Sequence, residues 1–222
     1  MKITYWSDFA CPFCYIGIAR LKRALRELGM ENQVEWERKS FQLRKGNDYG
    51  SCPTCGNVKQ ALEGTNGSHF QQKYRLSESG AKSQFDEMYR MGLSEGLEIH
   101  YDTAPLCYTE DAHRLVKYVK DAGGDALASL VTETLFYMYL TKNMDISDHR
   151  VLLDIGKAVG LQEEGVISLL NSDDYGAEVM MDGIKADMYG IHVVPHFIVN
   201  GKYAIEGAQE VEIMKKTLLA AR

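Results

Sequence analysis

Residues 2–14 decide the fold, and they read Lys2-Ile3-Thr4-Tyr5-Trp6-Ser7-Asp8-Phe9-Ala10-Cys11-Pro12-Phe13-Cys14. The first six residues alternate in the manner of a short strand. After a brief turn, apolar residues recur at helical spacing from Ile18 to Leu28, and Gly29 is expected to end that helix. Pro12 suits the first turn of the helix, where the missing N–H of proline costs little. The stretch therefore places two cysteines at the start of a helix that follows a strand.

This position favours redox chemistry at the two cysteines. Unpaired N–H groups at a helix N-terminus favour an anion, and the thiolate is the nucleophilic form of cysteine. We expect Cys11 to attack a substrate disulfide and Cys14, deeper on the same helical face, to resolve the mixed disulfide. Neither step needs a cofactor. The alternative is a pair of unreactive buried thiols.

The remaining pattern predicts a sheet interrupted by a helical block. Strands are expected over 33–41, 196–199 and 202–205, the last two joined by the hairpin turn Asn200-Gly201. Helices are expected over 112–119, 127–140, 151–159 and 177–189 and from Gly207 to about residue 221. This order predicts an α/β protein with a four-stranded sheet, helices on both faces and a parallel first strand–helix–strand unit. Residues 1–45 and 174–222 would form the sheet domain, and 46–173 an inserted all-helical domain.

A proline stands just before the hairpin strand, in the segment Val193-Val194-Pro195-His196-Phe197. Proline is normally excluded from strands unless it is the first residue or forms a special bond. A cis Val194–Pro195 bond would fit, and it would let the backbone of Val194 pair with an extended substrate near the thiols. An ordinary trans proline at the strand start is the alternative, and the pattern alone favours it.

Composition limits the possible partners and the compartment. The chain has 222 residues and a formal net charge of -6, with no basic cluster of the kind that binds nucleic acid. No apolar stretch has the length of a membrane span, and the N-terminus does not resemble a signal peptide. We therefore predict a cytoplasmic protein with no nucleic-acid or membrane partner. The five cysteines are an odd number, which does not suit a structural disulfide framework.

A second cysteine pair lies in the polar loop at Cys52-Pro53-Thr54-Cys55. Three interpretations stay open: an accessory redox pair that relays electrons to Cys11 and Cys14, part of a zinc–thiolate site, or two solvated thiols. The remaining cysteine, Cys107, is predicted to be a small buried hydrophobe. No resident metal is predicted. Four histidines without metal spacing are expected at the surface: His69, His100, His113 and His149.

Two segments carry a resemblance to a known family. Residues 7–17 and 190–209 are similar to the active-site segment and the cis-proline hairpin of DsbA-like oxidoreductases, in particular the FrnE-like cytosolic branch. The resemblance implies a thioredoxin fold with a large helical insertion and a cis-proline facing the redox pair. It carries over the roles of Cys11, Cys14 and Pro195 and implies substrate contacts at three further residues: Val194, Pro12 and Phe13. Asp8 and Tyr15 match as well and are candidates for tuning the thiols, although Asp8 equally suits a helix cap.

The chain also departs from its relatives. Pro12-Phe13 lacks the histidine of strongly oxidising DsbA proteins, so we expect a less stabilised thiolate and a more reducing potential. Related isomerases of hydroxychromene-carboxylate and kappa-class glutathione transferases typically carry serine at the first position and use glutathione. The leading hypothesis is thus an oxidoreductase of protein or small-molecule disulfides, monomeric or homodimeric, with glutathione as a candidate co-substrate. A glutathione-dependent isomerase or transferase is the enzymatic alternative. The non-enzymatic alternative is a redox-sensing or zinc-holding protein that uses Cys52 and Cys55.

Overall fold

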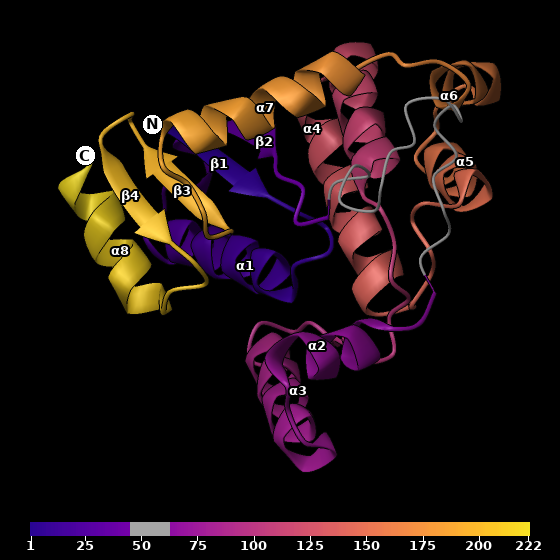
Figure 1. Ribbon diagram of the computed structural model, residues 1–222. Helices are drawn as coiled ribbons and strands as arrows, with labels where there is room; N and C mark the ends of the chain where they lie inside the picture. The colour runs from indigo at the N-terminus through magenta and orange to yellow at the C-terminus, as the bar shows by residue number, and fades with distance from the viewer. Residues whose placement is uncertain (45–62) are drawn as a thin grey trace.

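A computed structural model describes residues 1–44 and 63–222. Its centre is a four-stranded sheet with the order β2-β1-β3-β4 (Figure 1). The strands are β1 (Lys2–Ser7), β2 (Glu35–Ser40), β3 (His196–Val199) and β4 (Tyr203–Glu206). β1 pairs parallel with β2 and antiparallel with β3, and β3 pairs antiparallel with β4. The predicted strands, their pairing and the α/β fold class are confirmed: this is a thioredoxin fold with a helical insertion.

Helices cover both faces of the sheet. α1 (Pro12–Glu27) packs beside α8 (Val211–Ala220) on one face, and α7 (Gly176–Met188) crosses the other (Figure 1). Successive side chains of a strand point to opposite faces. Trp6 therefore lies on the α7 side, where its Nε1 donates to the backbone oxygen of Asp182 at 3.0 Å. This packing fixes the end of β1, from which the chain turns toward Cys11.

Local signals set the turns as expected. Asn200 and Gly201 both have positive φ, 50° and 69°, as a tight hairpin requires. Asn200 also accepts from the backbone N–H of Lys2 at 2.8 Å and donates to the backbone oxygen of Ala221 at 2.8 Å. The turn thus joins the start of β1 to the end of the chain.

Five α-helices of the described chain lie between β2 and α7. They are α2 (Asn66–Tyr74), α3 (Glu78–Leu93), α4 (Glu110–Leu140), α5 (His149–Ala158) and α6 (Glu163–Leu170). Figure 1 shows α4 beside the sheet, α5 and α6 beyond it, and α2 and α3 as a separate hairpin. α4 joins the two predicted helices 112–119 and 127–140, with a break at Gly124. The domain division stays a prediction, and its first border falls outside the described residues.

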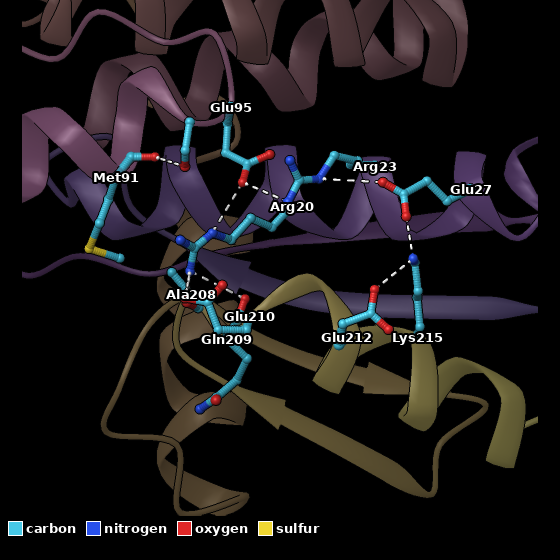
Figure 2. A network of polar contacts seen from close by, with 11 residues as sticks. Arg20, Arg23, Glu27, Met91, Glu95, Ala208, Gln209, Glu210, Glu212 and Lys215 are labelled. Atoms are coloured by element: carbon cyan, nitrogen blue, oxygen red, sulfur yellow. Dashed lines mark hydrogen bonds and ion pairs between the residues drawn. The ribbon is translucent and has the colours of Figure 1, made fainter.

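A buried ion-pair network holds the end of α3 on α1. The carboxylate of Glu95 is only 2% exposed and lies 3.3 Å from both the Nε of Arg20 and an Nη of Arg23 (Figure 2). Arg20 also donates to the backbone oxygen of Ala208 at 2.8 Å and pairs with Glu210 at 3.1 Å. One arginine of α1 therefore ties the helical hairpin to the segment that follows β4.

Candidate functional site

The two cysteines lie where a helix N-terminus meets the sheet. Cys11 is the N-cap of α1 and Pro12 its first residue. The backbone N–H of Cys11 donates to the oxygen of Asp8 at 3.2 Å, and that of Cys14 donates to the oxygen of Cys11 at 3.0 Å. Both thiols are free. Cys11 is 6% exposed whereas Cys14 is 0% exposed, so the two thiols differ in their access to a substrate.

Cys14 is held as a neutral thiol by its surroundings. Burial raises its pKa well above the ordinary value, and the adjacent Cys11 raises it further. The backbone N–H of Asp8 donates to the sulfur at 3.4 Å and opposes this rise only in part. A protonated, enclosed thiol suits a group that acts second in disulfide exchange.

The proline segment lies directly against this helix start. The Val194–Pro195 peptide bond is cis. The backbone oxygen of Val194 accepts from the Cys11 sulfur at 3.5 Å. On α1, a Cβ added to Gly17 would lie 2.6 Å from the Cγ of Pro195, so only glycine leaves room for the proline ring. Two segments nearly the whole chain apart thus meet at Cys11.

Asp8 is completely buried next to Cys14 and belongs to a group of polar side chains that includes His113. Its carboxylate accepts from the backbone N–H of Leu43 at 2.7 Å and of Ala10 at 3.3 Å, and lies 3.4 Å from the Nε2 of His113. Asp8 is not the cap of α1, because Cys11 occupies that position. Its N–H reaches Cys14, so its position suits the tuning role considered above.

The prediction that His113 lies at the surface is wrong: it is 0% exposed. In α4, His113 is buried together with Ala112 and Val116. The sequence signal for this burial is that His113 lies among the apolar residues of the helix face that packs inward. Arg38 donates to the Nδ1 of His113 at 3.1 Å. Since arginine has no acceptor, Nδ1 must accept, and Nε2 carries the proton that it donates to the oxygen of Phe41 at 3.0 Å.

The pKa shifts of the two side chains favour an ionised Asp8 carboxylate beside a neutral His113 imidazole. Burial lowers the pKa of His113, which outweighs the opposing effect of Asp8. Burial alone would raise the pKa of Asp8, but the adjacent His113 ring and the hydrogen bond from the Leu43 N–H lower it below its usual value. A fixed negative charge therefore lies near Cys14, and it contributes to the raised pKa of that thiol.

The remaining predicted residues line the site or support it. Pro12 is buried and Phe13 half-buried at the start of α1. Tyr15 stacks on Phe136 of α4 with ring centres 5.1 Å apart, and burial raises its pKa to about 12. Sequence reasoning missed Tyr101. Burial raises the Tyr101 pKa to about 12, and the nearby charge of Cys11 adds to the rise.

Cys107 is the remaining cysteine of the described residues. Cys52 and Cys55 lie outside the described residues. Cys107 is buried as predicted, and burial raises its pKa to about 12. Within residues 1–44 and 63–222 we find neither a cluster of three potential metal ligands nor a helix that could cross a membrane.

Comparisons with known proteins place this architecture. The DSBA-like thioredoxin domain model matches residues 2–219. A probable DsbA oxidoreductase from Streptomyces coelicolor is 26% identical with a TM-score of 0.84, covering 100% of this chain and 89% of its own. A 2-hydroxychromene-2-carboxylate isomerase is 13% identical with a TM-score of 0.70, covering 99% and 96%. The cytosolic disulfide reductase DsbM from Pseudomonas aeruginosa, solved with GSH, is 14% identical with a TM-score of 0.62, covering 99% and 98%.

The last two similarities show the fold alone, because one fold carries both an isomerase and a reductase. The family match is different in kind, since it extends over almost the whole chain and includes the Cys11–Cys14 segment and the Val194–Pro195 segment. With its free cysteine pair at the start of α1, the chain belongs to the family of DSBA-like thioredoxin domains, which are thiol-disulfide oxidoreductases and related enzymes.

Proposed function

We propose that the chain exchanges disulfides through Cys11 and Cys14. The Cys11 thiolate attacks one sulfur of a substrate disulfide, which forms a mixed disulfide and releases the other substrate sulfur as a thiolate. Cys14 then loses its proton and attacks the Cys11 sulfur, which forms the Cys11–Cys14 disulfide and releases the second substrate thiolate. Two electrons pass to the substrate, and the reverse sequence oxidises a dithiol. The observation that carries the proposal is the arrangement of a slightly exposed thiol at a helix N-cap with a fully enclosed thiol behind it.

The Val194–Pro195 segment supports the assignment of a substrate-binding role. The Val194 backbone lies beside the Cys11 sulfur, where an extended substrate strand would run. Pro12 and Phe13 are next to the attacking sulfur along the chain and would contact the same substrate. Asp8 and Tyr15 complete the proposed set as residues that position or tune the thiols.

Protein disulfides are the substrate class that the neighbouring surface favours. Three large apolar residues precede Val194, and each is more than a third exposed: Met188 at 78%, Tyr189 at 67% and Val193 at 55%. Exposed apolar groups beside a reaction centre suit a partner with its own apolar side chains. We therefore propose that the enzyme binds extended polypeptide segments, with glutathione as the small thiol that recycles the dithiol. A cytoplasmic location would fit this pairing, since glutathione is the main thiol buffer there.

The test is a redox titration followed by trapping. Reduced protein is equilibrated with glutathione buffers, and the state of each thiol is read by alkylation and mass spectrometry. We expect a reversible two-electron transition at Cys11 and Cys14. Cys11→Ser should abolish disulfide exchange, whereas Cys14→Ser should accumulate a mixed disulfide at Cys11.

Cys107→Ser is the matched control, because Cys107 is equally buried and lies outside the pair. Cys52→Ser/Cys55→Ser tests whether the second pair relays electrons, through a shift of the transition. The oxidoreductase proposal fails if Cys11 and Cys14 form no disulfide across the buffer range. Turnover with glutathione that survives Cys14→Ser would instead support the isomerase or transferase alternative.

A further inference from the structure

A cavity of about 420 Å³ lies between the sheet domain and α4. Tyr5 of β1, Trp36 of β2 and Ile18 of α1 line one side, and Val116 of α4 lines the other. None of the lining residues is Cys11, Cys14, Val194 or Pro195, so within the described chain this space is separate from the redox site. Its volume falls in the range of about 300–1,000 Å³ that small-molecule sites occupy.

The backbone at the rim of this cavity has unusual dihedral angles at two positions. The break of α4 at Gly124, with φ 79° and ψ -178°, lies between the lining residues Asp121 and Asp125. Tyr175 precedes α7 in the left-handed region with φ 63°, which is rare for an aromatic residue. Its hydroxyl donates to Asp121 at 3.0 Å, so the two irregular segments are joined across the rim. Such departures often accompany binding sites.

Of the cations that line the cavity, one forms no ion pair with a described residue. Lys39 and Lys117 both pair with Asp182, at 3.5 Å and 2.5 Å, and Lys120 pairs with Asp125 at 2.9 Å. Lys22 pairs with Glu133. These pairs leave the lysines of the cavity neutralised.

Arg38 is the exception among the lining cations of the described chain. Its guanidinium donates to the ring of His113 and lies over the face of Phe9, at 4.6 Å from the ring centre. Its buried Nε has no hydrogen-bond partner within the described residues. The carboxylates of Asp8 and Asp182 act on Arg38 only at longer range, so an anionic ligand would supply the direct ion pair that the guanidinium lacks among the described residues.

We propose that this cavity is a binding site for a small aromatic carboxylate. The carboxylate would pair with Arg38, and the ring would lie against Trp36, which is half-buried and already meets Tyr5 edge to face at 5.8 Å. Planar carboxylates match the fork of a guanidinium, and a flat ring suits the aromatic wall. Binding of a ligand in this cavity would not involve Cys11 or Cys14.

The test uses 2-naphthoate as the probe and 2-naphthamide as its uncharged counterpart, in calorimetric titrations of the full chain. We expect saturable 1:1 binding of 2-naphthoate and at least tenfold weaker binding of the amide. Ala126→Trp adds bulk at a lining position and should weaken 2-naphthoate at least tenfold. Ala122→Trp is the matched control, because Ala122 is equally exposed on the same helix but does not line the cavity, and it should bind as the wild type does.

Arg38→Met removes the charge at similar length and should erase the preference for the carboxylate over the amide. Circular dichroism shows whether that variant folds. If it does not fold, the comparison of 2-naphthoate binding by Ala126→Trp and Ala122→Trp still tests the proposal. Absence of saturable 2-naphthoate binding overturns the proposal. Equal binding of the amide by the wild type overturns it too, as does unchanged 2-naphthoate binding in Ala126→Trp.

Discussion

Glu95→Gln is the most informative perturbation of the fold, because it removes one negative charge from beneath two arginines. The carboxylate is 2% exposed, Arg20 is 6% exposed and Arg23 is 36% exposed. Glutamine keeps the length of the side chain and one acceptor oxygen. The change therefore tests the charge of the Figure 2 network rather than its packing.

The magnitude follows from what Arg20 retains. Leaving a buried charge wholly uncompensated costs about 3–5 kcal/mol. Arg20 keeps its bond to the Ala208 oxygen at 2.8 Å and its pair with Glu210 at 3.1 Å, and the side chain of Arg23 is 36% exposed. We therefore expect a loss of about 2 kcal/mol, below the full penalty. For a chain of this size that corresponds to a fall in Tm of about 4–8 °C.

The assay is thermal unfolding followed by circular dichroism, with urea titrations to obtain the free energy of unfolding. Glu87→Gln, on the helix α3 that precedes Glu95, is the control, because its pair with Arg90 is exposed on both sides at a distance of 3.8 Å. Exposed pairs contribute at most about 1 kcal/mol, so this control should change the stability little. Hydrogen exchange in α3 would show whether Glu95→Gln loosens the helical hairpin first.

The reasoning is refuted if Glu95→Gln and Glu87→Gln unfold together. That result would mean that solvation of the arginines compensates fully for the lost charge. A loss well above about 5 kcal/mol would also contradict the argument, since it would mean that the remaining contacts of Arg20 do not stabilise it.

Three further predictions concern the site and its supports. Gly17→Ala should lower the free energy of unfolding by about 1–3 kcal/mol and slow disulfide exchange, because the added Cβ would lie 2.6 Å from Pro195. Gly183→Ala in α7, where an added Cβ meets no atom within 4 Å, should instead raise the free energy of unfolding by about 0.5–1 kcal/mol. Urea titrations measure the stability of both variants, and turnover assays measure their activity. The folded pKa of Asp8 is lowered below 3.8, so its stabilisation is present above that value and is lost as the pH falls through the folded pKa. Wild type should therefore lose more stability than Asp8→Asn on going from about pH 5 to about pH 3 in urea titrations. Gly201→Ala places a Cβ at φ 69° and should lower the free energy of unfolding by about 1 kcal/mol in the same titrations, and an unchanged value would contradict the turn assignment.

Local signals allowed the sheet to be predicted, whereas several helices could not be. The hairpin at Asn200-Gly201 needs only its own two residues to be recognised. α3 buries little more than Ala81, Met88 and Gly92, so its apolar stripe is too sparse to stand out in the sequence. The break in α4 explains why two helices were expected: Gly124 interrupts the hydrogen bonds, yet the chain continues as one element.

The site divides in the same way between local and distant information. Cys11 and Cys14 could be chosen as candidates from the strand and the helix start that surround them. The isomer of Val194–Pro195 could not, because an X-Pro bond takes the form that its tertiary surroundings select. Arg38 was also missed, since it reaches the buried His113 from β2, whose own pattern gives no sign of this contact.

The position of His113 changes how the helical insertion should be understood. α4 supplies the imidazole that lies 3.4 Å from the Asp8 carboxylate, and the Asp8 N–H in turn contacts the Cys14 sulfur. α4 also supplies Phe136, which packs on Phe9 with ring centres 4.9 Å apart. Without α4, Asp8 would lose the partner that helps keep its carboxylate charged beside the thiols. The helical segment is therefore a structural part of the candidate site, and the sheet without it would present the same two cysteines in a different electrostatic environment.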